Sequence, residues 1–208
     1  MTIATFPARR RLAEFAGVEV AFFASGFAAL TYQICWQRIL FSSFGVDIES
    51  ITIIVSTFML GLGCGALLGG WLSDRHPSRL LLVFAACETG IGLFGIVSAD
   101  LIRAVADATV RTSLSTVALV NFILLLAPTM LMGATLPILV AHVIRRTGSV
   151  GISVGGLYFI NTLGAATACL VVGFVWFDHY GLRAAIHAAA IVNFLVAAVA
   201  AGFTVRRP

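Results

Sequence analysis

The sequence predicts an all-α integral membrane protein with six transmembrane helices. The chain contains six apolar stretches of about 20 residues or more, the length that an α-helix needs to cross a hydrocarbon core. Hydrophobic residues make up 60% of the chain and charged residues only 11%, a composition that excludes an ordinary soluble domain. Every one of the 13 basic side chains is an arginine, and most of them lie between the apolar stretches.

The six expected spans share high hydropathy and few charges. They cover residues 18–41, 51–72, 80–98, 114–143, 154–177 and 184–205. Residues 1–17 then form an Arg-rich leader, and residues 206–208 form a short tail. The first stretch is longer than the apolar core of a signal peptide, and no convincing small-residue cleavage site follows it, so we expect a retained helix.

The arginines predict how the spans are oriented, because short cytoplasmic loops carry an excess of basic residues. Six spans place most of them on one side of the membrane: Arg9, Arg10, Arg11, Arg75, Arg79, Arg145, Arg146, Arg206 and Arg207. We therefore expect both termini in the cytoplasm. Topology and contact with lipid headgroups account for these clusters, and no nucleic-acid partner is expected, since that would require a soluble basic face.

The connection between the third and fourth spans, residues 99–113, carries charges at every fourth position. These are Arg103, Asp107 and Arg111. The spacing is compatible with an amphipathic helix on the outer surface or with a solvated connector. The fourth stretch contains Pro128 and Pro137 and is longer than a bilayer requires, so we expect it to be kinked, tilted or projecting into the cytoplasm.

Small residues follow one face of the second span, where Gly61, Gly65 and Gly69 recur every four positions. Such a stripe lets another helix approach closely in lipid. The fifth span is a plausible partner because it too is rich in glycine and alanine. The stripe is interpreted as plain packing or as an interface that slides between conformational states.

No metal or cofactor is expected. The four cysteines, Cys35, Cys64, Cys87 and Cys169, are scattered singly within apolar segments and lack the spacing of a zinc site.

Polar residues inside the spans are the candidates for a binding site, because they are costly in lipid. Glu88 lies nine residues after Arg79, which places it about 13 Å into the bilayer, near the midplane. Its carboxyl group would suit proton coupling or binding of a cationic amine. The alternative is that polar groups of a neighbouring helix satisfy it.

Five amide side chains within the spans also need partners or water. Gln33 and Gln37 lie four residues apart on the first span and could line a cavity. Asn121 and Asn161 each fall well within a span, as does Asn193. For the nearby Trp36 and Arg38 we favour anchoring at the membrane interface.

The loop between the second and third spans resembles the signature loop of the major facilitator superfamily. Its matching residues are Gly70, Asp74, Arg75 and Arg79. The resemblance implies a hinge in which the Asp caps a neighbouring helix and pairs with an Arg, so that the cytoplasmic side is held closed in one state.

The wider chain resembles the membrane portion of bacterial spermidine synthase-like membrane proteins. The resemblance rests on segments 22–27, 32–38, 128–137 and 158–165, the last of which contains Tyr158 and Asn161. It implies a bacterial inner-membrane location and a solute-binding role for residues in these segments. The synthase domain of such proteins does not follow before Pro208, so we expect this chain not to be an enzyme.

Three functions are compatible with these observations. The first is a half-length transporter lobe that acts as a homodimer, or with a second half, on a small solute such as a cationic amine or polyamine. The second is a non-catalytic membrane module that partners a separately encoded synthase-like enzyme. The third is a structural subunit of a membrane complex.

Overall fold

The structure is a computed structural model that describes residues 5–44, 47–109 and 111–205. Within these ranges only the backbone is described at residues 5–15, 44, 47, 49–50, 114, 146 and 205. The fold is all-α, as predicted. The helices are α1 (Thr5–Phe44), α2 (Asp47–Arg75), α3 (Leu80–Thr109), α4 (Leu114–Thr147), α5 (Val150–Val171), the π-helical segment η1 (Val172–Trp176), α6 (Phe177–His179) and α7 (Gly181–Val205).

Six helical segments in the described ranges are long and apolar enough to cross a membrane. They are Ala16–Ser43, Ile51–Arg75, Leu80–Thr109, Ser115–Arg145, Val150–His179 and Gly181–Thr204. The fifth segment includes α5, η1 and α6, which follow one another without a break. The prediction of a six-helix membrane protein is therefore confirmed.

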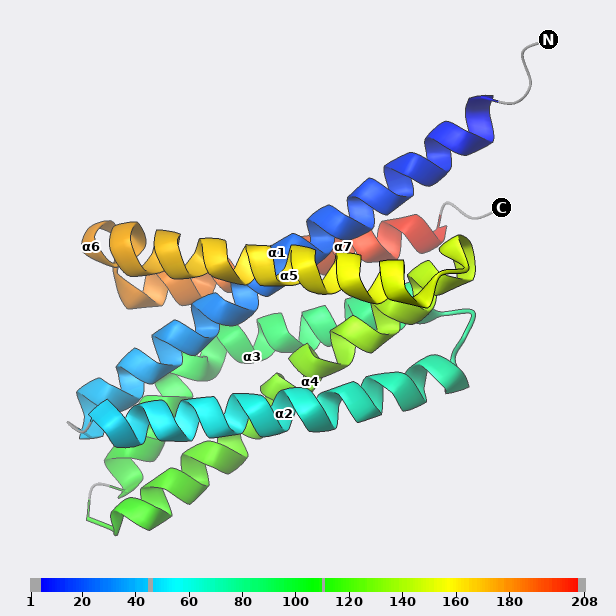
Figure 1. The fold of residues 1–208 in the computed structure, drawn as a ribbon. Helices are drawn as coiled ribbons and strands as arrows, with labels where there is room; N and C mark the ends of the chain where they lie inside the picture. Colours follow the sequence, from blue (N-terminus) through cyan, green and yellow to red (C-terminus); the bar gives the residue numbers. More distant parts are fainter. Residues whose placement is uncertain (1–4, 45–46, 110, 206–208) are drawn as a thin grey trace.

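Two helices extend beyond the spans expected from the sequence. Helix α1 begins at Thr5, so the described part of the leader continues the first span away from the bundle (Figure 1). Helix α3 continues to Thr109, and the prediction of a separate surface helix or a connector over residues 99–113 is wrong. Ile102 and Ala106 extend the buried face of α3, which explains why the helix does not end near residue 98.

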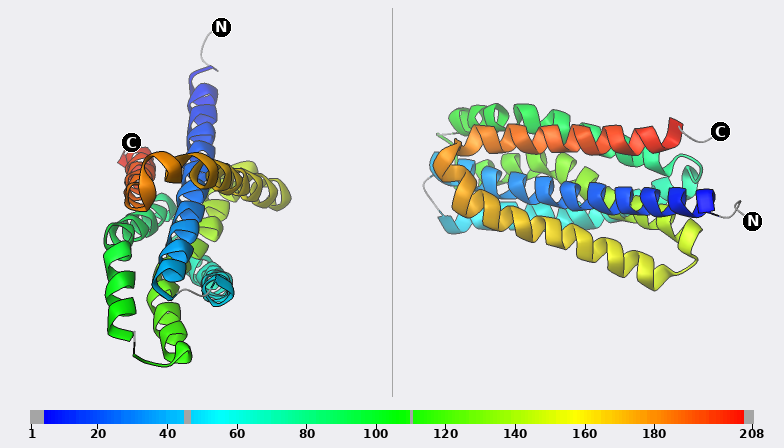
Figure 2. Two further views of the ribbon diagram at one scale, coloured as in Figure 1. Left: turned by 90° about the vertical axis from the view of Figure 1, so that its left-hand side faces the viewer. Right: turned by 90° about the horizontal axis from the view of Figure 1, so that it is seen from above.

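The two ends of the bundle differ in what they carry. The described ends of α1 and α7 lie at one end, together with the α2–α3 loop and the α4–α5 connection (Figures 1 and 2). The α1–α2, α3–α4 and α6–α7 connections lie at the opposite end. This topology places the end of α2, with Asp74 and Arg75, at the same end of the bundle as the described start of α1 and end of α7.

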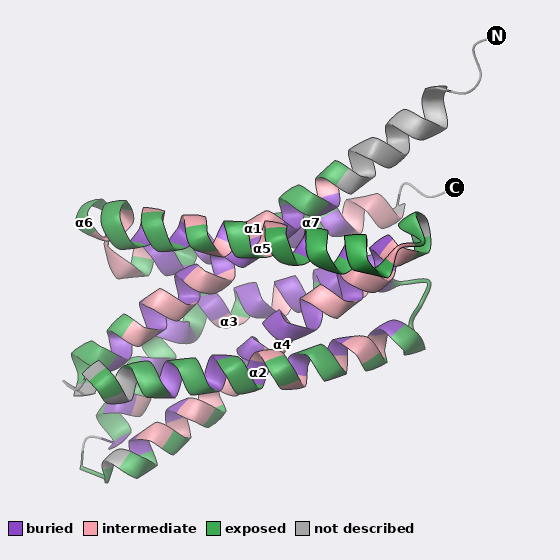
Figure 3. Ribbon diagram, viewed as in Figure 1, coloured by how far each residue is buried: buried purple, intermediate pink, exposed green. Residues whose placement is uncertain are grey.

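Two groups of buried apolar side chains form the core. The group at the end with the α3–α4 connection includes Tyr32, Trp36, Ile54, Ile102 and Leu125. The group nearer the termini includes Phe22, Phe84, Ile138, Leu139 and Val196. The largest contacts join α2 to α4, α1 to α5 and α7, and α3 to α4 and α7. Helix α5 covers α1 from outside and is mainly exposed (Figure 3).

The glycine stripe of α2 packs against α4. A Cβ atom at Gly65 would overlap the Met130 carbonyl oxygen, and one at Gly69 would overlap the Ala134 carbonyl oxygen. The fifth span, which was expected as the partner, is not in this contact. Gly133 explains why α4 is the helix that packs against this stripe. Because Gly133 has no side chain, the backbone of α4 can approach Leu62 of α2 closely.

Helix α4 contains both prolines yet runs without interruption from Leu114 to Thr147. Its axis is oblique to that of α2 (Figure 1). Proline cannot donate the usual backbone hydrogen bond. Next to Pro128, the hydroxyl group of Thr129 donates to the carbonyl oxygens of Leu125 and Leu126, at 2.9 Å each.

Candidate functional site

Glu88 of α3 is fully buried and lies between α1 and α7. The hydroxyl group of Ser25 in α1 donates to its Oε1 atom at 2.6 Å. The side-chain amide of Asn193 in α7 donates to its Oε2 atom at 2.7 Å. Both carboxyl oxygens therefore accept a hydrogen bond from a different helix, and Glu88 joins three spans.

The polar contacts continue along α1 toward the α3–α4 end. The hydroxyl group of Tyr32 donates to Asn193 Oδ1 at 3.1 Å. The ring of Tyr32 stacks on Trp36 with centroids 5.2 Å apart, and Trp36 Nε1 donates to Ser98 Oγ at 2.9 Å. We call Ser25, Tyr32, Trp36, Glu88, Ser98 and Asn193 the buried polar cluster.

Helical spacing explains how the buried polar cluster is built. Ser25, Tyr32 and Trp36 are seven and four residues apart, so they follow one face of α1. On α3, Gly95 lies on the same face as Glu88. A Cβ atom at Gly95 would overlap the Tyr32 hydroxyl group, so the glycine leaves the room that this group needs.

The structure favours the simpler interpretation of Glu88, in which neighbouring helices satisfy it. Its two oxygens already have donors, and the side chain has no exposed surface. A cationic amine or a proton could still compete with Ser25 and Asn193 for the same oxygens if the three helices separated. Because the buried carboxyl oxygens are not accessible to a solute, the cluster can accept a cation only in another conformation.

Of the buried polar cluster, only Glu88 was predicted as a site residue from the sequence. Ser25 and Ser98 gave no signal, because serine is common in membrane helices. The expectation that Trp36 anchors the chain at the interface is wrong, since its ring is fully buried. Its place on the same helical face as Ser25 and Tyr32 was the available signal.

The two predicted asparagines make different contacts. Asn161 of α5 is half-buried, and its side-chain amide donates to the Phe22 carbonyl oxygen of α1 at 3.2 Å. Asn121 is fully buried, and its amide donates to Val117 of its own helix at 2.9 Å. Its Oδ1 atom has no hydrogen-bond partner among the described residues. Neither asparagine joins the buried polar cluster.

The remaining predicted binding residues lie on the outside of the described bundle. Gln33 and Gln37 are half-buried, and Tyr158 is 62% exposed. Arg38, beside Gln37, is exposed, and its guanidinium lies 4.6 Å from the centroid of the Phe177 ring. The structure thus separates the predicted residues into a buried part around Glu88 and an outer part on α1 and α5.

The predicted hinge spans the last turns of α2, which contain Gly70, Asp74 and Arg75, and the following short loop, which ends at Arg79. Asp74, Arg75 and Arg79 are exposed, and the guanidinium of Arg75 lies 5.7 Å from the centroid of the Trp71 ring. Within the described part of the chain, Asp74 forms no ion pair with an arginine. A Cβ atom at Gly70 would meet no atom within 4 Å, so close packing does not require glycine there.

Comparisons of the chain with protein-family models, curated proteins and solved structures found no match. The class of protein therefore rests on the fold, which is that of a multi-pass membrane protein with six spanning helices. The polar residues within those helices carry the functional interpretation.

Proposed function

We propose that the chain is one lobe of a facilitator-like transporter, which pairs with a second copy to move a small solute across the bacterial inner membrane. Both termini would then lie in the cytoplasm. A cationic amine such as a polyamine is the proposed solute class, because of the family resemblance and the single deep carboxyl group at Glu88.

Uncovered polar side chains within the spans carry this proposal. Gln33, Thr162 and Tyr158 are all half-buried or exposed although they belong to membrane-spanning helices. In hydrocarbon, amide and hydroxyl groups without partners are unfavourable. Such groups usually face a bundle interior or a water-filled cavity. A second lobe that packed over these side chains would provide a bundle interior and a cavity between the two lobes.

Helix α5 is the span that most needs a cover. In its most apolar 18-residue window only 17% of the residues are buried, against 50% in the corresponding window of α3. Several of its glycines, including Gly155 and Gly156, have open space around them. Another helix could approach α5 closely at these positions, so a second copy is a suitable partner.

The role proposed for Glu88 depends on a change of conformation. When two lobes rock against each other, contacts between the helices of each lobe also adjust. Release of Ser25 or Asn193 from the Glu88 carboxyl group would expose an acceptor near the midplane. The buried state would represent a closed form of the site, and the open form would receive the amine or a proton.

Uptake into vesicles tests the proposal. Purified protein is reconstituted, and accumulation of radiolabelled spermidine is measured against external concentration. We expect saturable uptake, with a reduction of at least about tenfold in Glu88→Gln and a smaller reduction in Tyr158→Phe. Tyr180→Phe is the matched control, because Tyr180 is also exposed but lies in the α6–α7 connection.

Native mass spectrometry from mild detergent provides the second measurement. A dimer is expected at the protein concentrations that support uptake. A monomer together with no saturable uptake of spermidine, putrescine or other small amines would refute the proposal. Uptake that is unaffected by Glu88→Gln would retain the transporter but remove Glu88 from its mechanism.

A second candidate function is that of a membrane module for a separate synthase-like enzyme. The exposed arginines Arg75, Arg79 and Arg145 at the end with the termini favour it, because they offer a basic face to an acidic soluble partner. Co-purification with such an enzyme, lost when the three arginines are replaced by glutamine, would support this function. Failure to co-purify would count against it.

A further inference from the structure

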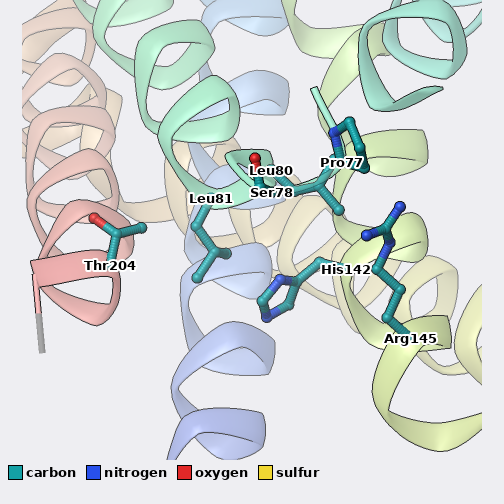
Figure 4. Close-up of a pocket in the computed structure, with 7 residues that line it drawn as sticks. All are labelled: Pro77, Ser78, Leu80, Leu81, His142, Arg145 and Thr204. Carbon is teal, nitrogen blue, oxygen red and sulfur yellow. The ribbon is translucent and has the colours of Figure 1, made fainter. Parts of the chain in front are cut away.

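A cavity of about 360 Å³ lies at the end of the bundle that carries the termini. It is open on one side and bordered by the α2–α3 loop, the first turn of α3 and the last turns of α4 and α7. Its lining residues are Pro77, Ser78, Leu80, Leu81, His142, Arg145 and Thr204 (Figure 4). It is separate from the buried polar cluster around Glu88, which contributes no residue to its lining.

The polar groups of this cavity favour an anion. Arg145 and His142 lie three residues apart on α4, so they share one face of the helix. The Arg145 guanidinium carries a permanent positive charge and five N–H donors. In Figure 4 it extends toward Pro77, while the His142 ring points toward Leu81. No Asp or Glu belongs to the described lining.

The start of α3 adds further donors to the same cavity. Helix α3 begins at Leu80, directly after Ser78 and Arg79. The first backbone N–H groups of a helix lack partners within it and are directed toward the space before the helix. Together with Arg145 and the Ser78 hydroxyl group, they form a set of donors suited to phosphate.

The walls of the cavity suit a ligand that is polar at one end. Leu80 and Leu81 are each 3% exposed and form an apolar floor. A second, smaller apolar cavity shares Leu81 and extends between α1, α3, α4 and α7 past Phe84 and Phe203. The polar cavity therefore lies at the ends of three spans, with polar groups on one side and apolar side chains on the other.

We propose that this cavity binds a phosphate group, with Arg145 and His142 as its principal side-chain contacts. Either an anionic phospholipid headgroup or a free phosphorylated molecule offers this chemistry. The volume admits a phosphate with a few attached atoms and is too small for a whole lipid, whose chains would remain in the bilayer. The site is independent of the transport function proposed above.

Native mass spectrometry with added lipid tests the lipid source. The full chain in mild detergent is incubated with phosphatidylglycerol or with phosphatidylcholine of the same acyl chains. We expect phosphatidylglycerol to be retained preferentially and Arg145→Gln to weaken its binding by about fivefold, the effect of one basic residue at an anionic surface. Arg75→Gln is the matched control, because Arg75 is exposed at the same end but does not line the cavity.

Inorganic phosphate tests the free source. A rise of the unfolding temperature with phosphate but not with chloride at equal ionic strength, absent in Arg145→Gln, would assign the site to free phosphate compounds. His142→Gln distinguishes binding in the cavity from general attraction to surface charge. It keeps the charge of Arg145, and it should still weaken phosphate binding. The proposal is overturned if neither probe binds preferentially, or if Arg75→Gln weakens binding as much as Arg145→Gln.

Discussion

Asn193 and Glu88 are 105 residues apart in the sequence, yet the side-chain amide of Asn193 lies 2.7 Å from the Glu88 carboxyl group. The same amide group accepts a hydrogen bond from Tyr32 through its oxygen. One asparagine therefore connects α1, α3 and α7 through both ends of its side chain. In a bilayer, where the hydrophobic effect does not hold helices together, such contacts help to specify which faces meet.

Asn193→Leu should lower the free energy of unfolding by roughly 1–3 kcal/mol, because a buried carboxyl oxygen loses its donor. Thermal or denaturant unfolding in mild detergent measures the change. Ser42→Ala is the control, since the Ser42 hydroxyl group donates only to Ile39 of its own helix. Equal stability of Asn193→Leu and wild type would show that the contact between α3 and α7 does not stabilise the protein.

Tyr32→Phe tests how far the buried polar cluster extends. The substitution removes the donor to Asn193 but keeps the stacking on Trp36, so we expect a loss of about 0.5–1.5 kcal/mol. Tyr158→Phe, which removes a hydroxyl group from an exposed position, should leave stability within about 0.5 kcal/mol. In a double-mutant cycle, Tyr32→Phe and Asn193→Leu should not be additive, because the two side chains are in contact. Additive effects would contradict the contact.

Gly65→Ala should weaken the contact between α2 and α4. The added Cβ atom would overlap the Met130 carbonyl oxygen, and backbone cannot move aside as a flexible side chain can. We expect a loss of about 1–3 kcal/mol, typical of an overpacked core. Gly63→Ala is a matched control two residues away, where the new atom meets nothing within 4 Å. If both variants unfold at the same temperature, the close approach of the two helices is wrong.

The fold could be predicted from the sequence because the bilayer sets the length of each apolar stretch. The helix against which each span packs could not be predicted in this way. The stripe of Gly61 and Gly65 shows that another helix approaches closely, but small residues fit many partners. Only the folded arrangement shows that Gly133 of α4 provides the matching surface. The spacing of Arg103 and Asp107 predicted a surface helix or a connector, whereas α3 continues through both residues.

The candidate site was predicted in part for a similar reason. Depth along the helix singled out Glu88, since a carboxyl group near the midplane is rare. The partners of Glu88 depend on how α1 and α7 are rotated about their own axes, and no single residue determines this rotation. The prediction for Trp36 was wrong because tryptophan is common at membrane interfaces, whereas here its N–H group donates a hydrogen bond to Ser98 inside the bundle.

The Asp100–Arg183 ion pair between α3 and α7 should contribute little to stability. Both side chains are more than half exposed, and exposed pairs typically contribute between 0 and about 1 kcal/mol. Arg183→Gln should therefore lower stability by less than Asn193→Leu, although both residues join the same two helices. The difference between Arg183→Gln and wild type should disappear in 1 M salt, which screens exposed charges. A loss that persists in salt would indicate a role other than the ion pair.

Cysteine labelling tests the proposed orientation of the six spans. His76→Cys places a thiol in the exposed α2–α3 loop, and Thr112→Cys places one in the exposed α3–α4 connection at the opposite end of the bundle. A maleimide that cannot cross membranes should label Thr112→Cys in intact bacterial spheroplasts and His76→Cys only after lysis. Of the native thiols, Cys35 and Cys87 are buried and Cys169 lies on the apolar surface of α5, so the unsubstituted protein should give a low background.

The reverse pattern would place the termini outside and refute the orientation that the arginines predict. Labelling of both sites before lysis would show that α3 does not cross the membrane, since residues 76 and 112 are separated by this single span.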